Sequence, residues 1–141
     1  MKKVFSLMLR ALMSCYSTTT EHSQGSLNAR IARNFHLWVA EKKYCNPDMT
    51  LSDVAEEFGV SEDALSYYFT NVAGERFSSI RKKLRLEEAR RLICDNPEMK
   101  LNQVARNVGI TDKCNFRKQF HSVYGYSPSE WQRRCIEMKK R

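Results

Sequence analysis

The sequence repeats one short pattern about fifty residues apart. The stretch "TLSDVAEEFGVS" (residues 50–61) returns in altered form as "KLNQVARNVGIT" (residues 100–111). Ala55 and Gly59 in the first copy correspond to Ala105 and Gly109 in the second. A small residue lets two helices cross closely, and a glycine adopts the positive φ that a tight turn needs. The repeat therefore predicts a duplicated helix-turn-helix unit.

The correspondence continues downstream after one extra residue in the second copy. The offset is 50 before that insertion and 51 after it. The later matched positions are Leu65 with Phe116, Phe69 with Phe120, Gly74 with Gly125, Phe77 with Pro128, and Ile80 with Trp131. A single Ala-x-x-x-Gly pattern is common in ordinary helical hairpins. Two copies on either side of a basic helix are a more specific indication of a duplicated helix-turn-helix unit.

Apolar residues recur at helical spacing along the chain, and no segment alternates with period two. The sequence therefore predicts an all-α fold of about seven helices. Thr50, Ser61 and one of Ser78 or Ser79 are expected N-caps, and Pro128 is expected to open the last helix. The expected helices cover residues 28–45, 51–58, 62–72, a long connecting stretch ending before 96, 101–108, 112–123 and 128 onward.

These helices predict two subdomains and a connection. Residues 28–75 and 97–141 would each hold one helix-turn-helix, the second followed by a basic tail, and residues 76–96 would join them. Residues 1–27 would form an arm and a polar linker. For residues 1–15 three interpretations stay open: an amphipathic arm, a remnant of a larger parent chain, or a lipoprotein-like signal ending at Cys15. The apolar run there is shorter than the ~20 residues that span a bilayer.

Charge is distributed unevenly. Residues 1–71 carry 7 Lys and Arg against 8 Asp and Glu, and residues 72–141 carry 17 against 8. A basic half-chain indicates a polyanionic partner, usually nucleic acid, although a merely solvated surface has the same composition. The 5 cysteines are scattered without a CxxC pair, and the 3 histidines are isolated. No metal site, cofactor or catalytic group is therefore expected.

The sequence resembles the DNA-binding domain of the AraC/XylS family of bacterial transcription regulators over about residues 28–134. The most similar parts are "RLEEARRLI" and "VARNVGITDKCNFRKQFHSVYGYSPSEW". The resemblance implies two helix-turn-helix subdomains joined by a long helix, with recognition helices in successive major grooves. Such grooves recur about every 34 Å along the duplex. It also implies a monomer on double-stranded DNA in the cytoplasm, away from membranes, and RNA polymerase as a partner of activators.

The family's base-facing positions fall on residues of unequal chemistry. In the second recognition helix they are Lys113, Cys114, Asn115, Arg117 and Lys118, and in the first they are Asp63, Ser66 and Tyr67. Basic residues such as Arg117 can donate to guanine edges or phosphates, and Asn115 can pair with adenine. Because Glu62 and Asp63 would repel phosphates, we expect the second motif to dominate.

The connecting helix supplies candidate phosphate contacts, namely Arg76, Arg81, Lys82, Lys83 and Arg90. A solvated surface is the alternative for these side chains, and a structural ion pair is the alternative for Arg85. For the whole chain, two alternatives to a DNA-binding regulator stay open. One is an interaction protein that binds regulators or RNA polymerase without contacting DNA bases, and the other is the output fragment of a larger sensor.

Overall fold

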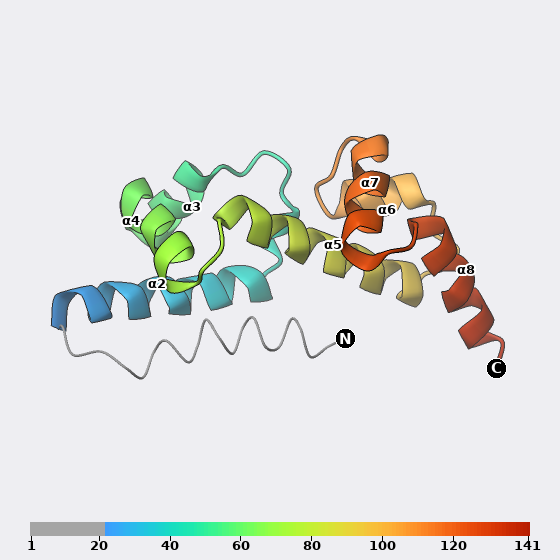
Figure 1. Cartoon of the computed structure of the whole chain (residues 1–141), viewed down its shortest axis with the longest axis horizontal. Coiled ribbons are helices and arrows are strands. Elements are labelled where there is room, and N and C mark those ends of the chain that lie inside the picture. Colours follow the sequence, from blue (N-terminus) through green and yellow to red (C-terminus); the bar gives the residue numbers. More distant parts are fainter. Residues whose placement is uncertain (1–21) are drawn as a thin grey trace. The chain divides into compact units, whose positions relative to one another are not determined.

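The computed structural model describes residues 22–141, with side chains from residue 25 onward. This part contains seven α-helices and no strand, which confirms the expected all-α class (Figure 1). The interpretations of residues 1–15 lie outside the described residues. The described residues divide into two compact units: unit 1 takes residues 22–43 and Met49–Ser79, and unit 2 takes Tyr44–Asp48 and Ile80–Arg141.

Unit 1 contains the first helix-turn-helix, which we call the first motif. In Figure 1, α3 and α4 lie on one side of the longer α2. Thr50 caps α3 through a reciprocal pair of hydrogen bonds with Asp53, and Gly59 ends it at φ 67°. Ser61 then caps α4 by accepting from the backbone N–H of Ala64. The elements are α2 (His22–Ala40), α3 (Leu51–Phe58), α4 (Glu62–Tyr67) and a π-helical turn (Tyr68–Val72).

Aromatic side chains fill the core of unit 1. Phe69, which is fully buried, lies 5.1 Å from Phe35 and 5.3 Å from Phe77 between ring centroids. Trp38 stacks on Phe35 and donates its indole N–H to the sulfur of Met49. Burying these rings removes a large apolar area from water, so this cluster is the main source of stability for the small unit.

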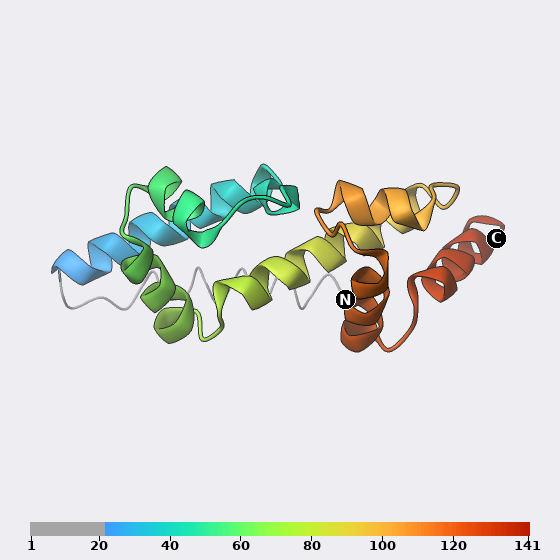
Figure 2. The ribbon, with the colours of Figure 1, turned by 90° about the horizontal axis from the view of Figure 1, so that it is seen from above.

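Unit 2 contains the second motif, made of α6, the turn at Gly109 and α7. Helix α5 begins in unit 1 and continues into unit 2. Figure 2 shows the chain passing from α7 into α8. That passage runs through Gly125 at φ 77° and a reciprocal capping pair between Ser127 and Glu130. The helices are α5 (Phe77–Asp95), α6 (Leu101–Asn107), α7 (Lys113–Tyr124) and α8 (Pro128–Lys139). A 3-10 turn (Lys43–Cys45) precedes the first motif.

The core of unit 2 lies between α5, α6 and α7, and its centre includes Leu86, Val104 and Phe120, all fully buried. Helix α8 is fixed to the rest of the unit through polar contacts. Trp131 donates its indole N–H to the carbonyl of Arg90 at 2.9 Å, and Gln132 donates to the carbonyls of Pro97 and Met99. The tandem pattern in the sequence therefore corresponds to two similarly built motifs with separate cores.

Three local differences from the sequence-based expectations have physical explanations. Helix α2 begins at His22 rather than residue 28, because extending an existing helix adds one hydrogen bond per ordered residue and needs no apolar period. Ser78 and Ser79 lie inside α5, which begins at Phe77, and the Ser79 hydroxyl donates to Glu75. The segment after Tyr67 is π-helical, and this wide turn contains two buried neighbouring rings, Tyr68 and Phe69.

Candidate nucleic-acid interface

Helix α7 is a firmly bounded helix with one apolar and one polar side. The Asp112 carboxylate accepts from the backbone N–H of Asn115 at 2.7 Å, and Gly125 ends the helix. Phe116 and Phe120 are buried in the core of unit 2. Since these two residues are four apart, they hold one side of α7 inward and leave the opposite side to solvent.

The five predicted base-facing residues of the second motif all lie on α7 outside the core. They are Lys113, Cys114, Asn115, Arg117 and Lys118, and all five are exposed. Lysine and arginine can only donate hydrogen bonds, and their charges attract phosphates. The arrangement suits insertion into a groove lined by hydrogen-bond acceptors.

The three predicted residues of the first motif are also exposed, but their chemistry differs. Asp63 and Ser66 lie on α4 with Tyr67, whose side chain is 56% exposed. The neighbouring Tyr68 is 1% exposed, so the structure decides which of these two tyrosines belongs to the core. The first motif thus offers a carboxylate, a hydroxyl and a phenol where the second offers three basic side chains.

The two motifs can be compared position by position through the repeat. Eight matched positions of the helix pairs are exposed in both copies. In the first motif these are Ser52, Asp53, Glu56, Glu57, Glu62, Asp63, Ser66 and Tyr67; in the second they are Asn102, Gln103, Arg106, Asn107, Lys113, Cys114, Arg117 and Lys118. One set has five carboxylates and no basic residue, and the other has four basic residues and no carboxylate. The exposed faces of two similar folds are therefore opposite in charge.

This comparison also shows which basic residues the sequence analysis missed. Arg106 on α6 and His121 on α7 are also exposed. Arg106 matches Glu56 at the offset of 50, so the repeat itself contained the signal that could have identified it.

The candidate phosphate contacts on α5 and in the turn before it are not equivalent. Arg76 and Lys83 are exposed, while Arg81 and Lys82 are half-buried. The guanidinium of Arg90 instead lies over two rings, 4.6 Å from the centroid of Trp131 and 5.1 Å from that of Tyr124. We therefore leave Arg90 out of the proposed phosphate contacts. Arg85 donates to the carbonyls of Tyr44 and Asn46, so its partner is the backbone and not the carboxylate that the sequence analysis considered.

We expect Arg90→Met to weaken unit 2 without changing how DNA binding depends on salt. The Arg90 side chain is 14% exposed. Its two cation–π contacts are worth roughly 1–3 kcal/mol together. The matched control is Arg76→Met, which removes an exposed charge and should cost little stability. Thermal unfolding and the salt dependence of duplex binding measure the two effects. A shallower salt slope for Arg90→Met than for Arg76→Met would contradict this assignment.

The described cysteines differ strongly in environment. Cys114 is exposed on α7, whereas Cys135 is fully buried on α8. Burial, together with a hydrogen bond to the Cys94 thiol, raises the pKa of Cys135 to about 12. Among the described residues, no three His, Cys, Asp or Glu side chains gather in a way that could hold a metal ion.

This contrast predicts the order of alkylation. The thiolate is the reacting form, and a raised pKa keeps a thiol neutral until the pH rises through that value. At pH 8 a thiol with a pKa of about 12 is ionised in only about one molecule in ten thousand. Iodoacetamide should therefore modify Cys114 first and reach Cys135 only after unfolding, as mass spectrometry of digested samples would show. Equal rates for the two cysteines in the folded protein would contradict the described burial.

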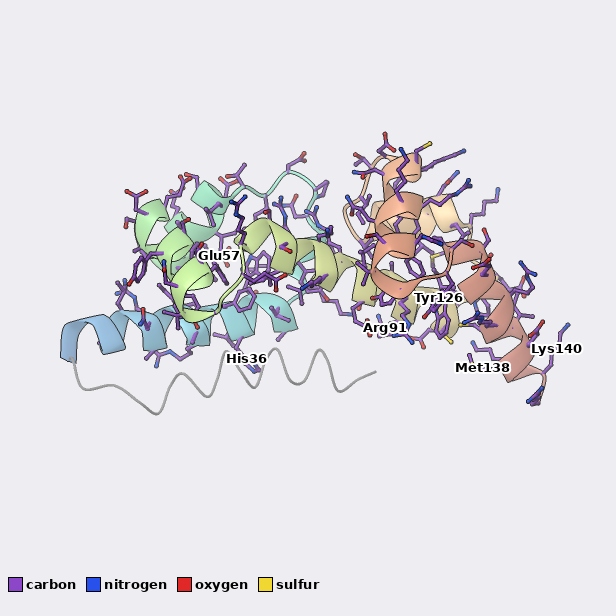
Figure 3. All side chains as sticks on the ribbon, viewed as in Figure 1. His36, Glu57, Arg91, Tyr126, Met138 and Lys140 are labelled. Carbon is purple, nitrogen blue, oxygen red and sulfur yellow. The ribbon has the colours of Figure 1, made fainter. Side chains whose placement is uncertain are left out.

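Around Arg90, the aromatic residues of unit 2 form a continuous stack that supports α8. Tyr126, labelled in Figure 3, lies 5.5 Å from Trp131 and carries the guanidinium of Arg134 at 4.8 Å from its ring centroid. Burial and a hydrogen bond to Glu87 raise the pKa of Tyr124, so its hydroxyl stays a donor at neutral pH. Met138 and Lys140 are exposed near the end of α8 (Figure 3).

The helices of the described part include none with the length and apolar character needed to cross a bilayer. Comparisons with known proteins point to one class. A family model described as a helix-turn-helix domain matches residues 54–134. A curated relative, the transcriptional activator RhrA of Rhizobium meliloti, is 33% identical over 94 residues, which make up 66% of this chain and 30% of RhrA. The chain thus spans less than a third of that relative.

Solved structures agree with the sequence matches. The C-terminal domain of AraT, a response regulator from Geobacillus stearothermophilus, has a TM-score of 0.66 at 28% identity, covering 74% of this chain and 84% of that domain. A transcriptional regulator from Chromobacterium violaceum, described as having an AraC-type DNA-binding domain, has a TM-score of 0.66 at 20% identity. That match covers 76% of this chain and 92% of the other, and it shows the likeness of fold.

Proposed function

This chain belongs to the AraC-type helix-turn-helix family of DNA-binding transcription regulators, and we propose that it regulates transcription mainly through its second motif. The observation that carries the proposal is the charge contrast between the motifs. Four basic residues stand on the exposed positions of α6 and α7, and five carboxylates stand on the matched set of α3 and α4. Duplex DNA carries one phosphate charge per ~1.7 Å of its axis, so the basic face is attracted and the acidic face is repelled.

In this proposal each motif offers one recognition helix to a major groove, and the two grooves are successive. Helix α7 makes the base contacts that dominate affinity, and α4 adds limited contacts through Ser66 and Tyr67. The basic residues of α5 and the turn before it that remain candidates, Arg76, Arg81, Lys82 and Lys83, contact phosphates. The chain binds as a monomer, and RNA polymerase is its protein partner when it activates a promoter. The name of the relative RhrA, a transcriptional activator, supports activation alone.

The test is selection of duplexes from a random pool, followed by binding measured at several salt concentrations. A DNA-binding regulator should select a defined sequence, and its log affinity should fall with log salt at about −0.9 per phosphate contacted. A selected site with one conserved major-groove segment would indicate dominance of one motif, and two segments about ten base pairs apart would indicate equal use. Failure to shift any duplex at low salt would overturn the proposal.

A second candidate function rests on the acidic face of the first motif. A surface with five carboxylates is suited to a basic protein surface, and this favours an interaction protein that binds another regulator or RNA polymerase. In that case the chain would bind a protein partner while selecting no duplex sequence. The random-pool selection therefore separates the two candidates.

A further inference from the structure

Two side-chain amides on α7 form a hydrogen bond one helical turn apart. The Nε2 group of Gln119 donates to Oδ1 of Asn115 at 3.0 Å. Asn115 is exposed and lies three residues from Lys118 on the same side of α7, whereas Gln119 is half-buried. The Asp112 carboxylate also accepts a hydrogen bond from the backbone N–H of Asn115, so Asn115 takes part in the N-cap of α7.

This contact matters because an asparagine amide has two chemically different ends. Its oxygen accepts hydrogen bonds and its NH₂ group donates two. Pairing with adenine uses both ends at the base edge, with the oxygen accepting from N6 and the nitrogen donating to N7. In this chain the oxygen is the end of the Asn115 amide that bonds to Gln119 along the helix.

We propose that Gln119 is a positioning residue, which orients Asn115 so that the operator base opposite it must present acceptors in the major groove. This inference rests on the proposed function. Guanine offers N7 and O6, and thymine offers O4, whereas cytosine offers the N4 donor. Asn115 therefore favours guanine or thymine, and the pairing with adenine that the sequence analysis considered becomes the weaker choice.

The neighbouring side chains give the same selection rule. Lys113, Arg117 and Lys118 are also exposed on α7 and can only donate hydrogen bonds, so an outward NH₂ on Asn115 would add a further donor to this helix. The first motif has Ala64 and Tyr68 at the matched positions, and it therefore lacks the amide pair. The selection rule belongs to the second motif alone.

The experiment compares random-pool selections for the full chain and three variants, each checked for folding by thermal melting. Asn115→Ala identifies the base pair that Asn115 contacts, because the preference at that position should disappear. Gln119→Met keeps the length of the side chain but cannot donate, and it should reduce the preference at this same base pair by about fivefold. Its affinity for unselected DNA and its salt slope should remain those of the parent chain.

The most informative variant is Gln119→Glu, since a carboxylate can only accept. The carboxylate introduced by this change would accept a hydrogen bond from the NH₂ group of Asn115, so the amide would turn and present its oxygen to the base. Preference should then move from guanine or thymine to a base with a donor, cytosine or adenine. A change confined to one base pair is an effect that general loss of stability or of positive charge would not produce.

Several results would overturn the inference while leaving the proposed function intact. The first is a parent chain that selects a sequence in which Asn115→Ala changes no position. The second is a Gln119→Met variant that keeps the parent preference at the base pair identified by Asn115→Ala. A Gln119→Glu variant that still prefers guanine or thymine would have the same meaning. A parent chain that selects no sequence at all would instead defeat the proposed function.

Discussion

Replacing Arg117 and Lys118 together by alanine is expected to lower affinity for the selected duplex by about 100-fold or more. Both side chains are exposed on α7 and lie outside the core that contains Phe116 and Phe120, so their loss should leave that core unchanged. A good base contact is worth about 1–3 kcal/mol, and two of them together account for this loss. If both side chains also neutralise phosphates, the log–log salt slope should become less steep by about 1.8.

The repeat provides a matched control for this double variant. Ser66 and Tyr67 occupy the equivalent positions of the first motif at the offset of 51, and both are exposed. Ser66→Ala with Tyr67→Ala should reduce affinity by less than about tenfold in fluorescence anisotropy titrations, since a serine or tyrosine contact to DNA lacks the charge of a basic side chain. A collapse of binding in this control, with little change for the α7 variant, would reverse the ranking of the two motifs.

The acidic residues of the first motif allow a test in the opposite direction. Asp63 is exposed in the first turn of α4, where a carboxylate near a phosphate is repelled. Asp63→Ala should leave affinity unchanged or strengthen it by a few-fold, most visibly at low salt where screening is weakest. If this single change abolished binding, Asp63 would be a base contact, with a cytosine amino group as the natural donor.

Much of the fold could be predicted because the repeat fixes two similar motifs. The caps at Thr50 and Ser61 and the turns at Gly59 and Gly109 follow from local chemistry, and the structure confirms them. The start of α5 could not be predicted, since Ser78 and Ser79 are good N-caps in isolation. Its position depends on burial of Phe77 against Trp38 and Phe69, contacts that connect distant parts of unit 1.

The candidate site shows the same limit. The exposure of the predicted residues on α7 follows from helical periodicity around Phe116 and Phe120. The placement of Arg90 does not, because in the sequence it is one of several basic residues on a long helix. Only the fold brings Tyr124 and Trp131 around its guanidinium. The spacing of four between the two amides of α7 is visible in the sequence. The base choice that we propose for them depends in addition on which residues of α7 are exposed.

Gly109 combines the turn of the second motif with close packing against a neighbouring backbone segment. Its φ is 86°, and a Cβ added there would lie 2.5 Å from the carbonyl oxygen of Cys45. That backbone cannot easily yield, because Arg85 donates to the carbonyls on either side of it, at Tyr44 and Asn46. Burial lowers the pKa of Arg85, yet an arginine remains charged at neutral pH, so these bonds persist.

We therefore expect Gly109→Ala to destabilise unit 2 by about 2–6 kcal/mol, for two reasons that add. A positive φ in a residue with a side chain costs roughly 1–3 kcal/mol, and overpacking against a fixed neighbour costs roughly as much again. Gly59→Ala is the matched control at the same position of the first motif. Its φ is 67°, but an added Cβ there meets nothing within 4 Å, so only the backbone strain applies.

Amide hydrogen exchange separates the two units in one measurement. In Gly109→Ala, protection should fall sharply in α6 and α7 and remain at the parent level in α3 and α4. In Gly59→Ala, a smaller fall should be confined to α3 and α4. Equal losses for the two variants would mean that the strained φ alone sets the cost and that the contact with Cys45 adds nothing. Because the second motif is also the proposed DNA-binding one, Gly109→Ala should weaken duplex binding more than Gly59→Ala does.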